Sequence, residues 1–296
     1  MYFTGFADEV SGNIIKQIEV TKKLGWKNIE ARSIDGVNIT DISDEKFDEV
    51  YHKLQESNIE INCFGSAVAN WGKKPGSEED FKKSIEELKR AIPRMKKLGT
   101  KMIRGMSFSI PEEDSPELEN KIIEKLKALV ALCEDAGIIY LHENCMNYYS
   151  QSYQHMDKLL TIIDSSYFKV VFDTGNPVFS DNRMGPTPYN KQSSWEAYQH
   201  LKDKIEYIHI KDGIFLKDEE KTRFTFPAEG DGYVREVLKD MLSNGYDGGI
   251  SIEPHMGSVY HEKADKTQTP DEYKYNVYLE YGKRIMKLVE EIKAEI

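Results

Sequence analysis

The stretch FKVVFDTGN, residues 168–176, carries the pattern that decides the fold. Apolar residues dominate its first half, as in a buried strand, and Asp173 then follows directly, before a Thr-Gly-Asn turn. Two explanations of Asp173 are open at this point. It caps the helix that follows, since aspartate is a common N-cap residue, or it is a functional group held at the carboxyl end of the strand.

A unit of a short apolar run, a loop and an amphipathic helix recurs along the chain. Strands are predicted at 2–7, 28–32, 59–65, 100–105, 137–144, 168–176, 205–212 and 248–255. Helices are predicted near 12–24, 44–57, 78–98, 116–136, 152–164, 192–204, 231–244 and 271–294. Alternation of this kind indicates parallel strands, and eight pairs favour a closed (β/α)₈ TIM barrel forming a single domain over residues 1–296. An open doubly wound sheet is less well supported, because no GxGxxG follows the first strand.

The composition indicates a soluble enzyme-sized domain with a substantial core. The chain has 296 residues, of which 39% are hydrophobic and 31% charged. Its apolar runs are far shorter than the roughly 18 residues of a membrane span, so no membrane partner is expected. The opening MYFTGFADEV has no signal-peptide pattern, and three cysteines without a CxxC pair suit a reducing cytosol, so we expect a cytoplasmic protein. A net charge of −11 disfavours nucleic acid.

Polar residues end the last four predicted strands. In a (β/α)₈ barrel the active site lies at the carboxyl ends of the strands. Strands five to eight end in Glu143, Asp173, His209 and Glu253. Side chains alternate between the two faces of a strand, so His209 shares its face with Tyr207, two positions earlier. Each of the other three residues likewise shares a face with the residue two positions before it. If these faces point into the barrel, the four side chains converge on one point.

Such a cluster predicts one divalent metal ion. Three carboxylates close together repel one another unless a cation neutralises them. Oxygen-rich ligation with one imidazole suits Mn²⁺, Mg²⁺, Co²⁺ or Zn²⁺ without choosing among them. Taken singly, each residue also has an ordinary explanation, such as an ion pair for a glutamate or a structural hydrogen bond for His209. Four such residues on four consecutive strands favour the metal.

Four motifs carry a resemblance to a known family. LHEN (141–144), FDTGN (172–176), HIKD (209–212) and SIEPH (251–255), in this order, resemble the xylose isomerase-like TIM-barrel superfamily, and within it the sugar phosphate isomerases and epimerases. The resemblance implies that Glu143, Asp173, His209 and Glu253 are the metal ligands. It further implies that Glu143 and Glu253 act as the acid–base pair on opposite faces of a sugar, with the metal stabilising an enediolate.

Five further residues are predicted to contact the substrate, most with an alternative. Asn176 stands where many epimerases have a histidine, and it can still hydrogen-bond a hydroxyl group. Arg104 either binds a substrate oxyanion or orients Glu143. Lys211 and His255 either line the mouth of the site or serve as ordinary polar residues. Trp71 either forms an apolar wall or packs within its loop.

The function predicted from these observations is a metal-dependent isomerase or epimerase of carbohydrate metabolism, acting on a small sugar or polyol derivative through alpha-proton abstraction. The alternative is a metal-dependent dehydratase of a keto-inositol or dehydroshikimate-like compound. An endonuclease IV-like DNA repair enzyme is disfavoured, since the predicted third strand has no histidine and the chain is acidic. A non-catalytic sugar-binding protein ranks low, because the ligand set is complete. Assembly into a homo-oligomer is left open.

Overall fold

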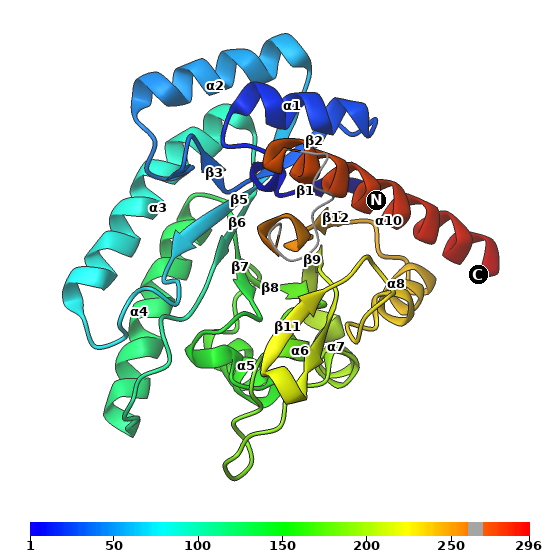
Figure 1. Ribbon diagram of the computed structural model, residues 1–296. Helices are drawn as coiled ribbons and strands as arrows, with labels where there is room; N and C mark the ends of the chain where they lie inside the picture. Colours follow the sequence, from blue (N-terminus) through cyan, green and yellow to red (C-terminus); the bar gives the residue numbers. More distant parts are fainter. Residues whose placement is uncertain (260–268) are drawn as a thin grey trace.

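A barrel of parallel strands forms the centre of the computed structural model, which describes residues 1–259 and 269–296 (Figure 1). The strand order is β1-β12-β9-β8-β7-β6-β5-β2, every ladder in this sheet is parallel, and β1 lies beside β2, so that the sheet curls into a nearly closed (β/α)₈ barrel. The predicted fold is therefore confirmed. The barrel strands are β1 (Tyr2–Gly5), β2 (Asn28–Ala31), β5 (Glu60–Val68), β6 (Met102–Gly105), β7 (Ile139–Glu143), β8 (Phe168–Asp173), β9 (Ile205–Ile210) and β12 (Gly249–Ile252).

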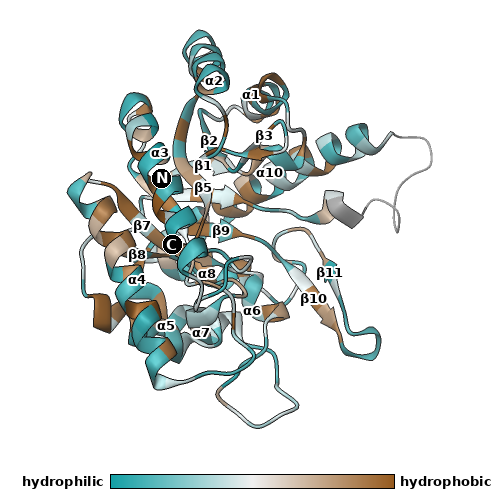
Figure 2. Cartoon of the chain, turned by 90° about the vertical axis from the view of Figure 1, so that its left-hand side faces the viewer, coloured by the Kyte–Doolittle hydropathy of each residue, from teal (hydrophilic) through white to brown (hydrophobic). Residues whose placement is uncertain are grey.

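Helices surround the barrel, and their apolar faces turn toward it (Figures 1 and 2). Each except the short α6, which was not predicted, lies within a few residues of its predicted range, because the cap residues in the sequence end the helices as expected. In α3, for example, the Ser77 hydroxyl accepts a hydrogen bond from the Asp80 N–H, and Gly99 ends the helix at a φ of 78°. The helices are α1 (Ile14–Lys23), α2 (Asp44–Ser57), α3 (Glu78–Leu98), α4 (Pro116–Asp135), α5 (Tyr153–Ile163), the short α6 (Asn176–Phe179), α7 (Ser194–Leu201), α8 (Val234–Ser243) and α10 (Pro270–Glu295).

Two antiparallel hairpins that the sequence analysis did not predict extend from the barrel. One pairs β3 (Ser33–Ile34) with β4 (Val37–Asn38), in the loop after β2. The other pairs β10 (Gly213–Leu216) with β11 (Lys221–Phe224), in the loop after β9. Both follow the carboxyl ends of barrel strands, so they stand on the side of the barrel where the polar strand ends meet. Figure 2 shows β10 and β11 projecting from the barrel as a ribbon of their own.

Polar groups connect across the interior of the barrel beneath these strand ends. An apolar cluster of Cys63, Leu141, Val171 and Tyr207 fills part of it. The Tyr207 hydroxyl donates to Glu30 Oε2 at 3.1 Å and accepts from Asn62 Nδ2 at 2.8 Å. The Thr4 hydroxyl in turn donates to Asn62 Oδ1 at 2.7 Å. We call Glu30, Tyr207, Asn62 and Thr4 the polar column.

Candidate active site at the carboxyl ends of the strands

Four side chains from four neighbouring strands meet at the top of the barrel. Strand register places Asp173 opposite His209, because β8 pairs directly with β9. One ligand atom from each of Glu143, Asp173, His209 and Glu253 lies within 4.8 Å of the others. All four residues are buried. The predicted convergence on one point is therefore present in the structure, and the role of these residues in holding a metal remains a prediction.

The two carboxylate oxygens of Asp173 have different partners, and the N-cap residue of α6 is Gly175. Its Oδ1 accepts hydrogen bonds from the backbone N–H groups of Gly175 at 2.8 Å and Asn176 at 2.7 Å, where α6 begins. Its Oδ2 forms an ion pair with Lys211 Nζ at 2.9 Å. Burial raises the pKa of Asp173 to about 6, although Lys211 acts in the opposite direction. One oxygen thus fixes the local backbone and the other faces the cluster.

His209 is oriented by a carboxylate on the far side of the barrel. Its Nε2 lies 3.1 and 3.0 Å from the two oxygens of Glu30, which also accepts from the Ser251 hydroxyl at 2.6 Å. Its Nδ1 faces Glu143 Oε1 at 3.4 Å. Burial lowers the pKa of His209, but Glu30 and Glu143 outweigh burial and raise it to about 10. In the neutral ring, Glu30 would hold the proton on Nε2 and leave the Nδ1 lone pair directed at the cluster.

Both glutamates of the cluster are held as carboxylates by cations. Arg104 Nη1 lies 3.3 Å from Glu143 Oε2, which matches the predicted alternative in which Arg104 orients Glu143. Arg32 Nη1 lies 2.8 Å from Glu253 Oε1, and Lys211 Nζ lies 3.1 Å from Glu253 Oε2. Burial alone would raise the pKa of each glutamate, but the cations outweigh it, to about 2 for Glu143 and well below the usual range for Glu253. Both side chains are therefore ionised near neutral pH.

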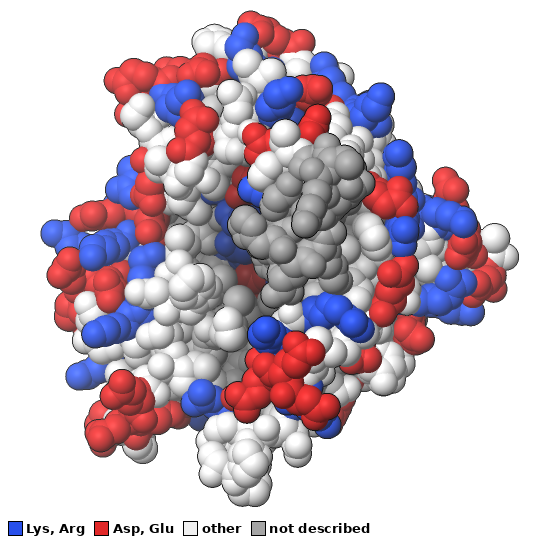
Figure 3. All heavy atoms as spheres, viewed as in Figure 1, with Lys and Arg blue, Asp and Glu red and all other residues white. Residues whose placement is uncertain are grey.

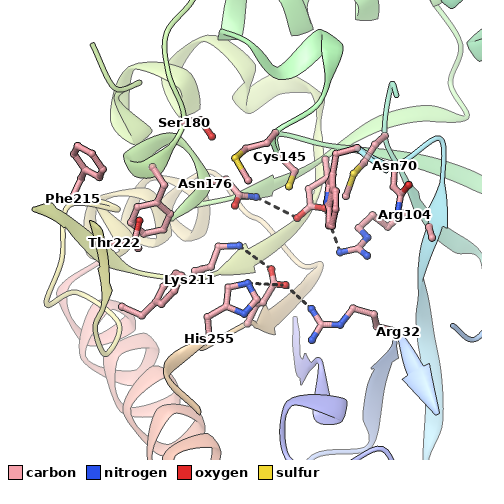
Figure 4. A pocket seen from close by; sticks show the side chains of 18 of the residues that line it. Arg32, Asn70, Arg104, Cys145, Asn176, Ser180, Lys211, Phe215, Thr222 and His255 are labelled. Atoms are coloured by element: carbon pink, nitrogen blue, oxygen red, sulfur yellow. Dashed lines mark hydrogen bonds and ion pairs between the residues drawn. The ribbon is translucent and has the colours of Figure 1, made fainter. Parts of the chain in front are cut away.

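A cavity of about 670 Å³ opens above the cluster, and Figure 3 shows a hollow in this face with charged side chains inside it. Figure 4 shows Arg32 and Arg104 on one side and hairpin residues Phe215 and Thr222 on the other. The five residues predicted to contact substrate all line this cavity: Trp71, Arg104, Asn176, Lys211 and His255.

These five residues differ in exposure and partners. Trp71 is 56% exposed, as expected for a cavity wall and not for a packed loop residue. Lys211 is buried between Asp173 and Glu253, so it is not a solvated loop lysine. Asn176 Nδ2 donates to Glu143 Oε1 at 3.4 Å. His255 has its Nδ1 at 3.0 Å from Glu9 Oε1, at the edge of the site.

Several residues that shape the site had no predicted role. Glu30 could have been found by the signal that identified Asp173, an acid inside a short apolar strand, NIEA. Arg32 lies just beyond the same strand, and its Nε is 2.9 Å from Asp8 Oδ2. Phe215 and Phe224 belong to the β10–β11 hairpin, so their place in the cavity wall follows only once that hairpin is known.

The cluster fits a divalent cation on its own chemistry. Glu143 Oε2, Asp173 Oδ2 and His209 Nδ1 are buried and have no hydrogen bond within the described part of the chain. The two carboxylate oxygens have ion pairs, with Arg104 and Lys211, and His209 Nδ1 faces Glu143. Buried polar atoms without hydrogen bonds are costly, and a coordinated cation would give each of the three a further partner. A second group, Glu9, Glu253 and His255, also has ligand atoms within 4.8 Å of one another. It fits a metal less well, because Glu9 and His255 are only partly buried, whereas all four residues of the first group are buried.

Fold and site together define a (β/α)₈ barrel with an acid-rich pocket at the carboxyl ends of its strands. The family described as the xylose isomerase-like TIM barrel matches residues 18–275, and the chain belongs to this family. No helix among the described residues is long and apolar enough to cross a membrane.

Individual relatives are more distant. The inosose dehydratase of Clostridium perfringens is 27% identical over 136 residues, which cover 45% of this chain and 46% of the relative. The chain thus spans about half the length of the curated relatives it matches. A crystal structure of the IOLI protein with a bound zinc atom has a TM-score of 0.72 at 17% identity, covering 99% of each chain. An L-ribulose 3-epimerase structure has a TM-score of 0.68 at 13% identity, covering 99% of this chain and 96% of the other. These structural similarities show a shared fold.

Proposed function

We propose that the protein is a divalent-metal-dependent isomerase or epimerase that removes the proton alpha to the carbonyl group of a small polyhydroxylated ketone. The observation that carries the proposal is the meeting of two ionised, buried glutamates, Glu143 and Glu253, in one cluster with Asp173 and His209. Two bases that reach one carbon from different strands permit inversion or transfer to the neighbouring carbon, which a single base does not easily achieve.

The four residues of the cluster would hold the ion, and a bound divalent cation would stabilise the negative charge that develops on the carbonyl oxygen. Glu253 is the proposed base. Arg32 and Lys211 keep it ionised, so it can accept the carbon-bound proton. Glu143, oriented by Arg104, starts as a carboxylate. It would first take up a proton from water or a substrate hydroxyl group and then return it to the opposite face or to the adjacent carbon. Asn176 is placed to hydrogen-bond a substrate hydroxyl group beside Glu143.

A dehydratase reaction is the second candidate, and the inosose dehydratases among the sequence relatives favour it. Its first step is the same removal of the alpha proton. The electron pair then forms a carbon–carbon double bond as the β-hydroxyl group departs, and a proton from the enzyme converts that group to water. The residues proposed above serve both reactions, so the product decides between them.

Proton exchange tests this proposal directly. The purified protein, loaded with Mn²⁺ in deuterated water, is incubated with a panel of ketoses and keto-inositols, and carbon-bound protons are followed by NMR. Exchange is expected in the wild type and to fall by roughly 10²–10⁴-fold in Glu253→Gln, as is typical for loss of a general base. Glu236→Gln, an exposed acid in the first turn of α8, is the matched control.

The outcomes separate the candidates. An epimer or isomer supports the first function, and a dehydrated product supports the second. Exchange that persists unchanged in Glu253→Gln, or that needs no metal, contradicts the proposed mechanism.

A further inference from the structure

The cations that line the cavity in the described part of the chain are already paired with carboxylates of the protein. Arg104 pairs with Glu143, and Arg32 bridges Asp8 and Glu253. Lys211 bridges Asp173 and Glu253. At the rim, Lys191 Nζ lies 2.8 Å from Asp181 Oδ1 and 4.4 Å from the centre of the Phe215 ring. None of these four cations is left without a carboxylate partner for an incoming anion.

The balance of charge stays negative even with a divalent ion in place. Three cations lie against the cluster, Arg32, Arg104 and Lys211, and a bound ion would add two further positive charges. The carboxylates that belong to the cluster, or that contact it or its three cations, are Asp8, Glu9, Glu30, Glu143, Asp173 and Glu253. With His209 neutral, six negative charges therefore face five positive ones, and this balance among the described residues does not attract a further dianion.

Backbone amides in the loop after the seventh barrel strand, one part of the usual anion site of this fold, are already hydrogen-bonded to a side chain of the protein. In (β/α)₈ barrels a phosphate group is frequently bound by the loops after strands seven and eight. Here β9 is the seventh barrel strand, and Asp212 follows it. The Asp212 carboxylate accepts hydrogen bonds from the N–H groups of Gly213 at 2.8 Å, Gly230 at 3.1 Å and Gly232 at 2.9 Å. A buried side chain of the protein thus fills the group of amides that could otherwise receive a phosphate.

Aromatic and other apolar side chains form a large part of the remaining described cavity wall. Phe179, Phe215 and Phe224 come from α6 and the β10–β11 hairpin, and Trp71 and Met146 lie among the other lining residues. Apolar faces of this kind suit the C–H face of a sugar or cyclitol ring, while Asn176, Asn70 and Thr222 offer hydrogen bonds to hydroxyl groups.

We propose that the pocket selects an uncharged polyhydroxylated ketone and excludes the corresponding phosphate monoester. The inference rests on the proposed function and narrows its substrate class. A phosphate group brings about 1.5 to 2 negative charges at neutral pH. It would have to leave water beside an excess of carboxylates. The described cations of the cavity are already paired and the amides around Asp212 are occupied, which makes its entry unfavourable.

Matched pairs of substrates test the proposal. The metal-loaded protein is given each neutral ketose together with its phosphate monoester, for example fructose and fructose 6-phosphate, in the deuterium-exchange assay. We expect exchange with a neutral member to exceed that with its phosphate by at least 100-fold. Faster exchange with the phosphate overturns this inference and leaves the proposed function supported. If neither the ketoses nor their phosphates show exchange, the proposed function loses its support. The exclusion of phosphate is then tested by the binding measurement described next.

Binding is measured on the metal-free protein by ³¹P NMR with fructose 6-phosphate and inorganic phosphate, at constant ionic strength. The expected result is no binding below 10 mM. A dissociation constant under 1 mM for either probe overturns the inference, whatever the exchange assay shows.

A charge variant at the rim of the cavity tests whether the pairing of Lys191 with Asp181 keeps phosphate out. Asp181→Asn removes the partner of Lys191 and should increase the affinity for fructose 6-phosphate several-fold. Asp203→Asn removes the same charge from the segment that precedes β9, at the opposite end of the barrel, and should change nothing. Equal responses of the two variants would show that pairing of Lys191 does not control anion entry and would overturn that part of the inference.

Discussion

Substitution of Glu30 by glutamine should weaken metal binding although Glu30 is not a proposed ligand. The Glu30 carboxylate is buried and contacts three groups: His209 Nε2, the Tyr207 hydroxyl and the Ser251 hydroxyl. Glutamine has the same shape but no charge and only one acceptor oxygen. If that oxygen faces His209, the ring keeps its proton on Nε2 and loses only the stabilising charge.

Loss of such a carboxylate partner typically costs about 10- to 100-fold in metal affinity, or about 1.4–2.8 kcal/mol. If the glutamine amide instead donates to His209 Nε2, the proton moves to Nδ1, the atom that faces Glu143 and the cluster. The ring can then no longer offer its lone pair there, and the loss of affinity should exceed this range.

The assay is competition of Zn²⁺ or Mn²⁺ between the protein and a chromophoric chelator, at fixed pH, with thermal unfolding as a check on folding. Ser251→Ala is the matched control, because it removes one hydrogen bond to Glu30 but leaves the carboxylate against His209. We expect this control to change metal affinity less than threefold. A Glu30→Gln protein that is folded and binds metal within twofold of the wild type would refute the reasoning.

Two further predictions concern stability. Burial lowers the pKa of His142 to about 4 from 6.5, so the unfolded chain takes up a proton first as the pH falls, and this group should cost about 1.4 kcal/mol of stability per pH unit between pH 6.5 and 4. Urea unfolding at a series of pH values should show a shallower acid slope in His142→Gln, and an identical slope would contradict this. Gly105→Ala would place a Cβ against the Tyr140 ring and should lower the free energy of unfolding by about 1–3 kcal/mol. The control is Gly185→Ala, where a Cβ meets nothing within 4 Å, and it should be nearly neutral in the same measurement.

The parts of the structure that sequence predicted well are those governed by local rules. Helix α3 begins after its serine cap and ends at its glycine, as the sequence indicates. The alternation of side chains along the strands was enough to predict that Glu143 and Glu253 lie close together. The β10–β11 hairpin escaped prediction because its strands are only four residues long and are separated by a charged turn, which has the composition of an ordinary surface loop.

Contacts between residues far apart in the sequence were not predicted, for a different reason. Glu30 contacts His209 across 179 positions of sequence, and only closure of the barrel brings them together. The charge pairing of Lys211 was missed in the same way. Its parity suggested that it could reach the site, but the buried position between Asp173 and Glu253 depends on how three strands are aligned.

The polar column beneath the site has a practical consequence for anyone who engineers this barrel. Thr4, Asn62 and Tyr207 support Glu30 from below, and none of the three lines the cavity in which a substrate would sit. Stabilising designs that replace interior polar residues by leucine or valine would remove this support and weaken the proposed metal site without changing any of its ligands. Conservative changes at the same three positions offer a way to tune the affinity for the ion while the surface presented to the substrate stays the same.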